Sequence, residues 1–293
     1  MNLPNFFLVG APKCGTTAIA DYLRTHPHVF LSRPKEPYFF GSDLLPFRKR
    51  EGIENWDSYR ELFTSATAEH KAIGEATTLY SVSDDAIEQI VERFENPKFV
   101  FAYRDPSQVA YAFYSQIKLH GFEQRDFESA WDNPMEIADA PSWLLDYRRI
   151  ASLGWQAQRL LDTVPSEQLL LVDFNDFKSD TRQTYLRVLE FLGLEDDGRQ
   201  EFPVVNASRA ARSAHLFRLI SGPTARRLAN VCSSLFPEKL YTRITAAIRA
   251  VVSPKRPRPT LADEMRQKLD DGLAEQREQL SRLTKAQPQA SVT

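Results

Sequence analysis

Short apolar runs alternate with amphipathic segments along the first two thirds of the chain. The apolar runs have the length and composition of buried strands: Asn5–Gly10, Val29–Leu31, Lys71–Thr77, Lys98–Tyr103 and Leu169–Asp173. Apolar residues recur at helical spacing in three other segments: Thr16–Thr25, Leu144–Thr163 and Thr181–Leu192. Strands that alternate with helices favour a parallel sheet covered on both faces. We therefore predict a three-layer α/β fold with a central, mostly parallel sheet flanked by helices.

The C-terminal third is predicted to be mainly helical. A Pro-rich loop over Ser253–Thr260 precedes a polar helix over Leu261–Leu283, which carries a thin apolar stripe. The last residues, 285–293, are expected to form a frayed tail. No internal repeat or long linker divides the sequence, so we predict one domain over residues 1–293.

Composition places the chain among globular proteins. Hydrophobic residues make up 42% and charged residues 26% of its 293 residues, which excludes a disordered, collagen-like or coiled-coil chain. No run of 18 apolar residues occurs, and the first residues lack the basic flank and apolar core of a signal peptide. Cys14 and Cys232 are the only cysteines, and no Cys/His cluster has zinc spacing. We therefore expect a cytoplasmic protein without a disulfide framework, a transmembrane segment or a metal site.

A formal net charge of −2 hides a strongly basic segment. Between Pro203 and Thr260 the sequence has 11 lysines and arginines against one acid, Glu238. This excess suggests an anionic ligand or surface as a partner, and a solvated basic helical face explains it equally well. The segment lacks the interleaved aromatic residues of a single-strand nucleic-acid platform, so we expect no nucleic-acid partner.

A glycine-containing loop follows the first predicted strand and precedes the first predicted helix. Gly10 and Gly15 have the spacing of the Walker A pattern, but Thr16 stands where that pattern has its lysine, and Lys13 lies inside the loop. Successive amide groups and a helix N-terminus still converge on one anion site. A nucleotide triphosphatase also needs an acidic magnesium ligand after another strand. Here a predicted strand is followed by Arg104, a cation suited to a second phosphate.

These two segments resemble the signatures of a known family. The loop Pro12-Lys13-Cys14-Gly15-Thr16-Thr17 resembles the 5′-phosphosulfate loop of sulfotransferases that use 3′-phosphoadenosine 5′-phosphosulfate (PAPS), and Arg104-Asp105-Pro106 resembles their second signature. The resemblance implies a fold similar to P-loop nucleotide kinases, PAPS as sulfuryl donor and a hydroxyl acceptor, with no metal. It also implies a charge-stabilising role for Lys13 at the leaving phosphate. The implied cofactor-binding residues are Lys13, Cys14, Gly15, Thr16, Thr17 and Arg104.

The same resemblance extends to the basic loop before the last predicted helix. Lys255 and Arg256 lie where the family has a basic segment that contacts the 3′-phosphate and adenine, and a solvated basic turn is an equal alternative. Ala112, in contrast, stands where the family has a serine that binds the 3′-phosphate. A lost hydroxyl bond to a charged phosphate predicts weaker cofactor affinity, which Ser115 would offset in part.

Two further segments suggest the catalytic base and the acceptor site. The stretch Ser32–Phe40 resembles the family's Lys-Glu-x-His-Phe-Phe segment, which implies that Glu36 is the base, with Tyr38 in place of the histidine. A base in a partly desolvated cleft is expected to have a raised pKa. Gly74–Tyr80 resembles a Gly-Glu-x-x-Pro-x-Tyr segment, in which Glu75 either lines the acceptor pocket or has a structural role, and Thr78 replaces the proline.

The sequence is also consistent with alternatives. Glu36 could be a surface carboxylate beside Lys35, and the histidines are rival bases: His26, His28 and His120. The favoured function is transfer of a sulfuryl group to a carbohydrate, lipid or small metabolite. A P-loop-type nucleotide kinase would differ by requiring magnesium. A non-catalytic nucleotide- or anion-binding protein would bind polyanions with a steep salt dependence and transfer nothing.

Overall fold

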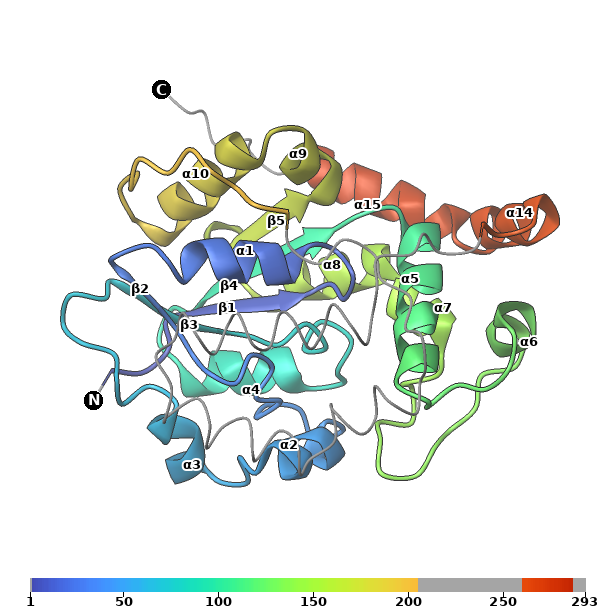
Figure 1. Ribbon diagram of the computed structural model, residues 1–293, viewed down its shortest axis with the longest axis horizontal. Coiled ribbons are helices and arrows are strands. Elements are labelled where there is room, and N and C mark those ends of the chain that lie inside the picture. The colour runs from blue at the N-terminus through green and yellow to red at the C-terminus, as the bar shows by residue number, and fades with distance from the viewer. Residues whose placement is uncertain (1, 205–259, 287–293) are drawn as a thin grey trace.

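The described residues of the computed structural model, 2–204 and 260–286, contain a five-stranded sheet whose strands are all parallel (Figure 1). The strand order is β2-β3-β1-β4-β5. The strands are β1 (Phe6–Gly10), β2 (Val29–Leu31), β3 (Ala72–Ala76), β4 (Lys98–Tyr103) and β5 (Leu169–Asp173). The predicted α/β fold with a central parallel sheet flanked by helices is confirmed.

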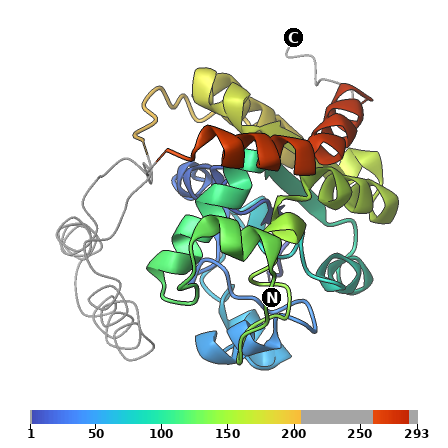
Figure 2. The same ribbon diagram turned by 90° about the vertical axis from the view of Figure 1, so that its right-hand side faces the viewer.

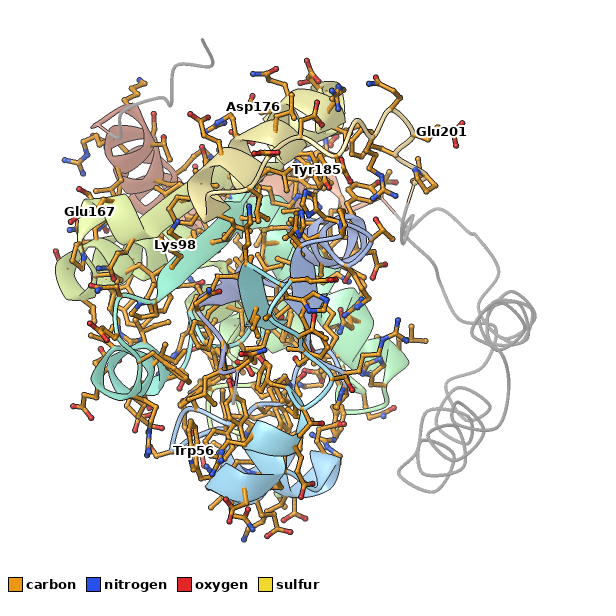
Figure 3. The ribbon with its side chains drawn as sticks, turned by 90° about the vertical axis from the view of Figure 1, so that its left-hand side faces the viewer. Trp56, Lys98, Glu167, Asp176, Tyr185 and Glu201 are labelled. Carbon is orange, nitrogen blue, oxygen red and sulfur yellow. The ribbon has the colours of Figure 1, made fainter. Side chains whose placement is uncertain are left out.

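Helices cover both faces of this sheet. The chain leaves β1 toward one edge and returns from β3 to β4 on the other side, so right-handed connections place α1 and α4 on opposite faces (Figure 1). Trp56 on α3 and Tyr185 on α10 likewise lie on opposite sides of the sheet (Figure 3). The helices of the first half are α1 (Thr16–Leu23), α2 (Leu45–Glu51), α3 (Trp56–Glu61), α4 (Ala86–Arg93), α5 (Pro106–Leu119) and α6 (Phe127–Asp132). Those of the second half are α7 (Tyr147–Ala151), α8 (Leu153–Thr163), α9 (Phe174–Ser179), α10 (Thr181–Leu192), α14 (Asp263–Gly272) and α15 (Ala274–Ala286).

The core is centred on β1, which has a neighbour on each side and is buried along its whole length. The ring of Phe7 packs against Phe99 on β4 and against Phe94 and Phe40, with ring centroids 5.1–6.2 Å apart. On the other face of the strand, Phe6 occupies the space that Gly74 on β3 leaves by having no side chain. Continuous apolar runs therefore formed strands because both faces of the sheet are covered.

Two segments predicted as continuous helices are divided. Leu144–Thr163 contains α7 and α8, because Ser152 between them is not helical and its hydroxyl donates to the Arg148 carbonyl at 2.8 Å. Leu261–Leu283 contains α14 and α15, which are separated at the buried Leu273. Helix α15 continues to Ala286, and the remainder of the tail predicted over residues 285–293 lies outside the described residues.

The C-terminal helices pack against the rest of the fold, with α14 beside α5 and α15 beside α8 (Figure 2). The crossing of α8 and α15 is close, since a Cβ on Gly154 would lie 2.6 Å from the Gln276 carbonyl oxygen. Among residues 2–204 and 260–286, no helix has both the length and the apolar character needed to cross a membrane.

Gly74→Ala is expected to destabilise the protein by about 1–3 kcal/mol, the usual cost of overpacking a core. A Cβ at Gly74 would lie 2.4–2.7 Å from three atoms of the Phe6 ring, which is fully buried. Denaturant unfolding should show a lower midpoint with an unchanged slope. Gly272→Ala is the control, because its Cβ would meet Trp131 at an ordinary 3.4 Å. An unchanged midpoint for Gly74→Ala would contradict the packing argument.

Candidate functional site

The carboxyl ends of the parallel strands bring the sequence motifs to one edge of the sheet. The loop Gly10–Gly15 follows β1, the segment Ser32–Gly41 follows β2, the turn Thr77–Tyr80 follows β3 and Arg104 follows β4. Residues from four separate parts of the sequence thus lie in the same region. Such an edge is where open α/β sheets bind their ligands.

The loop after β1 presents backbone amides at the start of α1. Gly15 has a φ of 83°, and a Cβ there would lie 2.7 Å from the Phe174 ring, so the position requires glycine. Helix α1 begins at the next residue, and its N-cap, Gly15, has no side chain to cap the N-terminus. Amides in the first turn of a helix have no intrahelical acceptor, and the helix dipole adds partial positive charge. The loop therefore forms an anion site from its backbone.

The side chains of this loop have different environments. Cys14 is fully buried, with Sγ 3.6 Å from the Pro12 carbonyl, and Thr16 is also buried. Burial raises the pKa of the Cys14 thiol, against the lowering effect of Arg104 and Lys13. Thr17 instead accepts a hydrogen bond at Oγ1 from Lys35 Nζ at 3.4 Å. The Thr17 hydroxyl thus contacts the segment after β2, and the Cys14 thiol lies beside the backbone of Arg104 after β4.

Two cations from different loops meet at this edge. Lys13 has a φ of 67°, and its Nζ donates to Gln116 Oε1 on α5 at 2.7 Å. Arg104 Nη1 donates to the Lys13 carbonyl at 3.2 Å, and Nη2 donates to Gln108. The guanidinium group of Arg104 lies 4.9 Å from the centre of the Phe174 ring. Among the described residues, its buried Nε has no hydrogen-bond partner, so the group keeps a donor for an anion.

Gln108 and Gln116 were not found by sequence reasoning. They lie four residues before and after Ala112, on one face of α5, and contact the two cations as neutral acceptors. Their spacing along the helix that follows Arg104 is the sequence feature that could have indicated them. Ala112 itself is buried. The hydroxyl of Ser115 donates to the Tyr111 carbonyl of the same helix at 2.7 Å.

A cavity of about 510 Å³ opens beside Arg104. Its other walls include Gln108 and Tyr111 from α5, and Leu261 and Arg266 from the C-terminal part of the chain. Thr260, the first described residue after the gap, also lines it. The other predicted cofactor-binding residues, Lys255 and Arg256, lie outside the described residues.

The carboxylate of Glu36 receives three donors. Tyr38 Oη donates to Oε2 at 2.5 Å, Thr78 Oγ1 donates to Oε1 at 3.0 Å, and Lys35 Nζ donates to Oε1 at 3.2 Å. Lys35 also donates to Thr17 in the first turn of α1, and so it connects the carboxylate to the anion site. Both departures from the family pattern in this region, Tyr38 and Thr78, therefore contact Glu36. The position of Lys35 was not anticipated from the sequence.

The pKa of Glu36 is lowered. Burial alone would raise this pKa, but the charge of Lys35 and the hydrogen bonds from Tyr38, Lys35 and Thr78 outweigh burial. The expectation of a raised pKa is wrong for this residue. Glu36 is ionised at neutral pH, and Oε2, which accepts from Tyr38 alone of these donors, retains a lone pair that can take a proton.

Glu75 has a different environment, fully buried in β3 between Tyr59 and Tyr80. Its burial raises the pKa of the carboxyl to about 8, against the smaller lowering effect of the Tyr80 and Tyr59 hydroxyls. The group is therefore mostly protonated at neutral pH. Because Glu75 has no exposed surface, it does not line an acceptor pocket, and the structural alternative is the one that fits.

Two of the rival histidines lie away from the anion site. His26 follows the C-terminal end of α1, opposite to the loop, and its Nε2 is 3.0 Å from the Glu195 carbonyl oxygen. His28 precedes β2, with Nδ1 2.9 Å from the Glu69 carbonyl oxygen. His120 caps the C-terminus of α5. Within residues 2–204 and 260–286, no three His, Cys, Asp or Glu side chains gather as a metal site requires.

Comparisons with known proteins agree on one family. The sulfotransferase domain family matches residues 3–206. Mouse carbohydrate sulfotransferase 15 is 26% identical over 267 residues, covering 72% of this chain and 47% of that protein. Mouse heparan sulfate glucosamine 3-O-sulfotransferase 3A1 is 29% identical over 197 residues, covering 66% and 46%. The chain thus spans about half the length of these curated relatives. A sulfotransferase crystal structure from Alicyclobacillus acidocaldarius has the same fold, with a TM-score of 0.61 and 24% identity over 83% of this chain and 100% of that chain.

Glu75→Gln is expected to change how stability depends on pH. The folded chain keeps a proton on Glu75 up to about pH 8, whereas the unfolded chain loses it near the ordinary value of 4.5. Unfolding therefore releases a proton between these values, and stability falls as pH rises by up to about 1.4 kcal/mol per unit. The glutamine variant lacks this slope, so its advantage over the natural chain should grow toward pH 8 and then level off.

Denaturant unfolding at several pH values measures this difference. Glu54→Gln removes an equal charge at an exposed position and serves as the control. Parallel stability curves for Glu75→Gln and the natural chain would show that the buried carboxyl does not titrate in this window.

Proposed function

Because the chain belongs to the sulfotransferase domain family, whose members are enzymes that use PAPS, we propose that it transfers a sulfuryl group from PAPS to a hydroxyl acceptor. The acceptor class is a carbohydrate, a lipid or a small metabolite. Relatives named for carbohydrate and heparan sulfate substrates favour the first of these classes.

The position of Lys35 carries this proposal. Its ammonium group lies 3.4 Å from Thr17 Oγ1 in the first turn of α1 and 3.2 Å from Glu36 Oε1. One side chain thereby spans the distance between an anion site and an ionised carboxylate. Sulfuryl transfer to a hydroxyl requires this arrangement, because the group that takes the proton must lie beside the site that holds the donor.

The residues at the sheet edge fit PAPS. The first-turn amides of α1 and Lys13 suit the 5′-phosphosulfate end. Arg104 Nε, which has no hydrogen-bond partner in the described part of the chain, suits the 3′-phosphate. The cavity beside Arg104 provides room for the nucleoside. Bound PAPS supplies an activated sulfuryl group on its 5′-phosphate.

The chain's own groups then have distinct tasks. Glu36 takes the acceptor's proton at Oε2, and Tyr38 and Thr78 orient the carboxylate. The positive charge of Lys13 stabilises negative charge at the phosphate end of the site. Gln116 and Gln108 hold the two cations through neutral amides, so they do not cancel the positive charge.

Arg104→Ala should remove the preference for a 3′-phosphate. The natural chain is expected to bind 3′-phosphoadenosine 5′-phosphate more tightly than ADP without magnesium. A lost charged hydrogen bond costs about 1.5–3 kcal/mol, so the variant should bind this ligand roughly 10- to 150-fold more weakly. Affinity for ADP should change less.

Calorimetric titration measures these affinities, with the exposed Arg282→Ala as a matched loss of charge. Equal affinity of the natural chain for both ligands, or binding that requires magnesium, would favour a nucleotide kinase. Tight binding without any sulfuryl transfer would favour a non-catalytic nucleotide-binding protein.

Glu36→Gln is expected to lower kcat about a hundredfold or more, the usual contribution of a general base. Affinity for 3′-phosphoadenosine 5′-phosphate should stay unchanged, because the amide keeps the size of the side chain and the anion site is intact. Initial rates with a panel of hydroxyl acceptors provide the measurement, and Glu54→Gln is the control for charge. Full activity of Glu36→Gln would exclude this residue as the base.

A further inference from the structure

A carboxyl group lies inside a cluster of aromatic side chains on one face of the sheet. Glu75 is fully buried on β3, in register with Phe7 of β1, and its nearest polar groups are the hydroxyls of Tyr80 and Tyr59. Among the described residues, neither carboxyl oxygen has a hydrogen-bond partner of regular geometry. A buried carboxyl in such surroundings costs stability that an apolar side chain of similar size would not. Its presence therefore calls for a role other than packing.

Tyr80 connects this carboxyl to the backbone of another segment. Its hydroxyl oxygen accepts from the amides of Phe39 at 3.0 Å and Phe40 at 3.2 Å. A phenol oxygen has two acceptor sites and one proton, so both acceptor sites are occupied and the proton must point elsewhere. Glu75 and Thr77 are the polar side chains beside this hydroxyl. The Tyr80 O–H must point away from both amides for its oxygen to accept from them.

The segment held by Tyr80 is the one that carries Glu36. Glu36 and Tyr38 both have positive φ, at 64° and 53°, a conformation that costs energy for residues with side chains. Such a backbone persists only when its surroundings hold it. Besides Tyr80, the contacts that hold its backbone include Glu36 N to the Ala76 carbonyl at 2.9 Å and Arg48 Nη1 to the Phe39 carbonyl at 2.9 Å.

We propose that Glu75 is a positioning residue: it orients the hydroxyl of Tyr80, which holds the amides of Phe39 and Phe40 and thereby the carboxylate of Glu36. The catalytic part of this inference rests on the proposed function, in which Glu36 is the base. The positioning itself is a property of the folded chain without any ligand.

Glu75→Met separates positioning from packing, because methionine has a similar volume and no hydrogen-bonding oxygen. We expect a higher denaturation midpoint at neutral pH, because a buried polar group is lost. The amides of Phe39 and Phe40 should nevertheless exchange with solvent about tenfold faster or more, as expected when a buried hydrogen bond is lost. In the same variant kcat should fall, while affinity for 3′-phosphoadenosine 5′-phosphate stays unchanged. A purely structural role would move stability and activity in the same direction.

Three variants with small changes complete the experiment. Tyr80→Phe removes only the hydroxyl and should reproduce the faster exchange, whereas Glu75→Gln keeps an acceptor oxygen and should restore slow exchange and most of kcat. Tyr59→Phe is the matched control, because Tyr59 also lies beside Glu75 but makes no hydrogen bond to either amide. It should leave both amides protected.

The outcomes are distinct. Unchanged exchange in Glu75→Met, or equally fast exchange in Tyr59→Phe, would overturn the proposal. Fast exchange in Thr77→Val together with slow exchange in Glu75→Met would assign the orienting role to Thr77 and also overturn it. Hydrogen exchange requires no turnover, so if the natural chain transfers no sulfuryl group, the proposed function fails while the positioning result still stands on its own.

Discussion

The place of β1 between β3 and β4 is the constraint on which the site depends. The connections that follow β1 and β4 diverge to opposite faces of the sheet, and open α/β sheets bind their ligands where the strand order reverses in this way. The loop after β1 and the residue after β4 meet there, where Arg104 donates to the carbonyl of Lys13. A different strand order would separate these groups even if every local motif were kept.

The surroundings of Glu36 keep its carboxylate ionised but also reduce its basicity. Donors from Lys35, Tyr38 and Thr78 keep the carboxylate ionised, so it is in the form that can accept a proton. The same donors lower its basicity, and proton-transfer catalysis weakens as the pKa of the base falls. Glu75 has the reverse condition, since burial raises its pKa and keeps it mostly protonated at neutral pH. Environment rather than residue type thus separates the roles of the two glutamates.

Features determined by short stretches of sequence could be predicted. The ranges Val29–Leu31, Lys98–Tyr103 and Leu169–Asp173 are strands with the predicted bounds, because a run buried on both faces is apolar throughout. The break at Leu273 could not be predicted in this way, since it depends on how that side chain is buried by neighbouring elements.

The same limit applies to the site. The glycine spacing of the loop indicated an anion site, but the contact of Gln116 with Lys13 joins residues 103 positions apart. The lowered pKa of Glu36 was mispredicted although two of its donors, Lys35 and Tyr38, are neighbours in sequence. Sequence spacing does not show that their side chains fold back onto the carboxylate, and the third donor, Thr78, is 42 positions away.

The buried thiol in the anion-binding loop has a consequence for redox chemistry. Positive surroundings usually convert a cysteine into a reactive thiolate, and Lys13 and Arg104 do act in that direction. Desolvation outweighs them, so Cys14 stays protonated and shielded from oxidants, which attack exposed thiolates first. The loop therefore combines strong positive potential with chemical inertness, and peroxide or disulfide stress should leave its anion site intact.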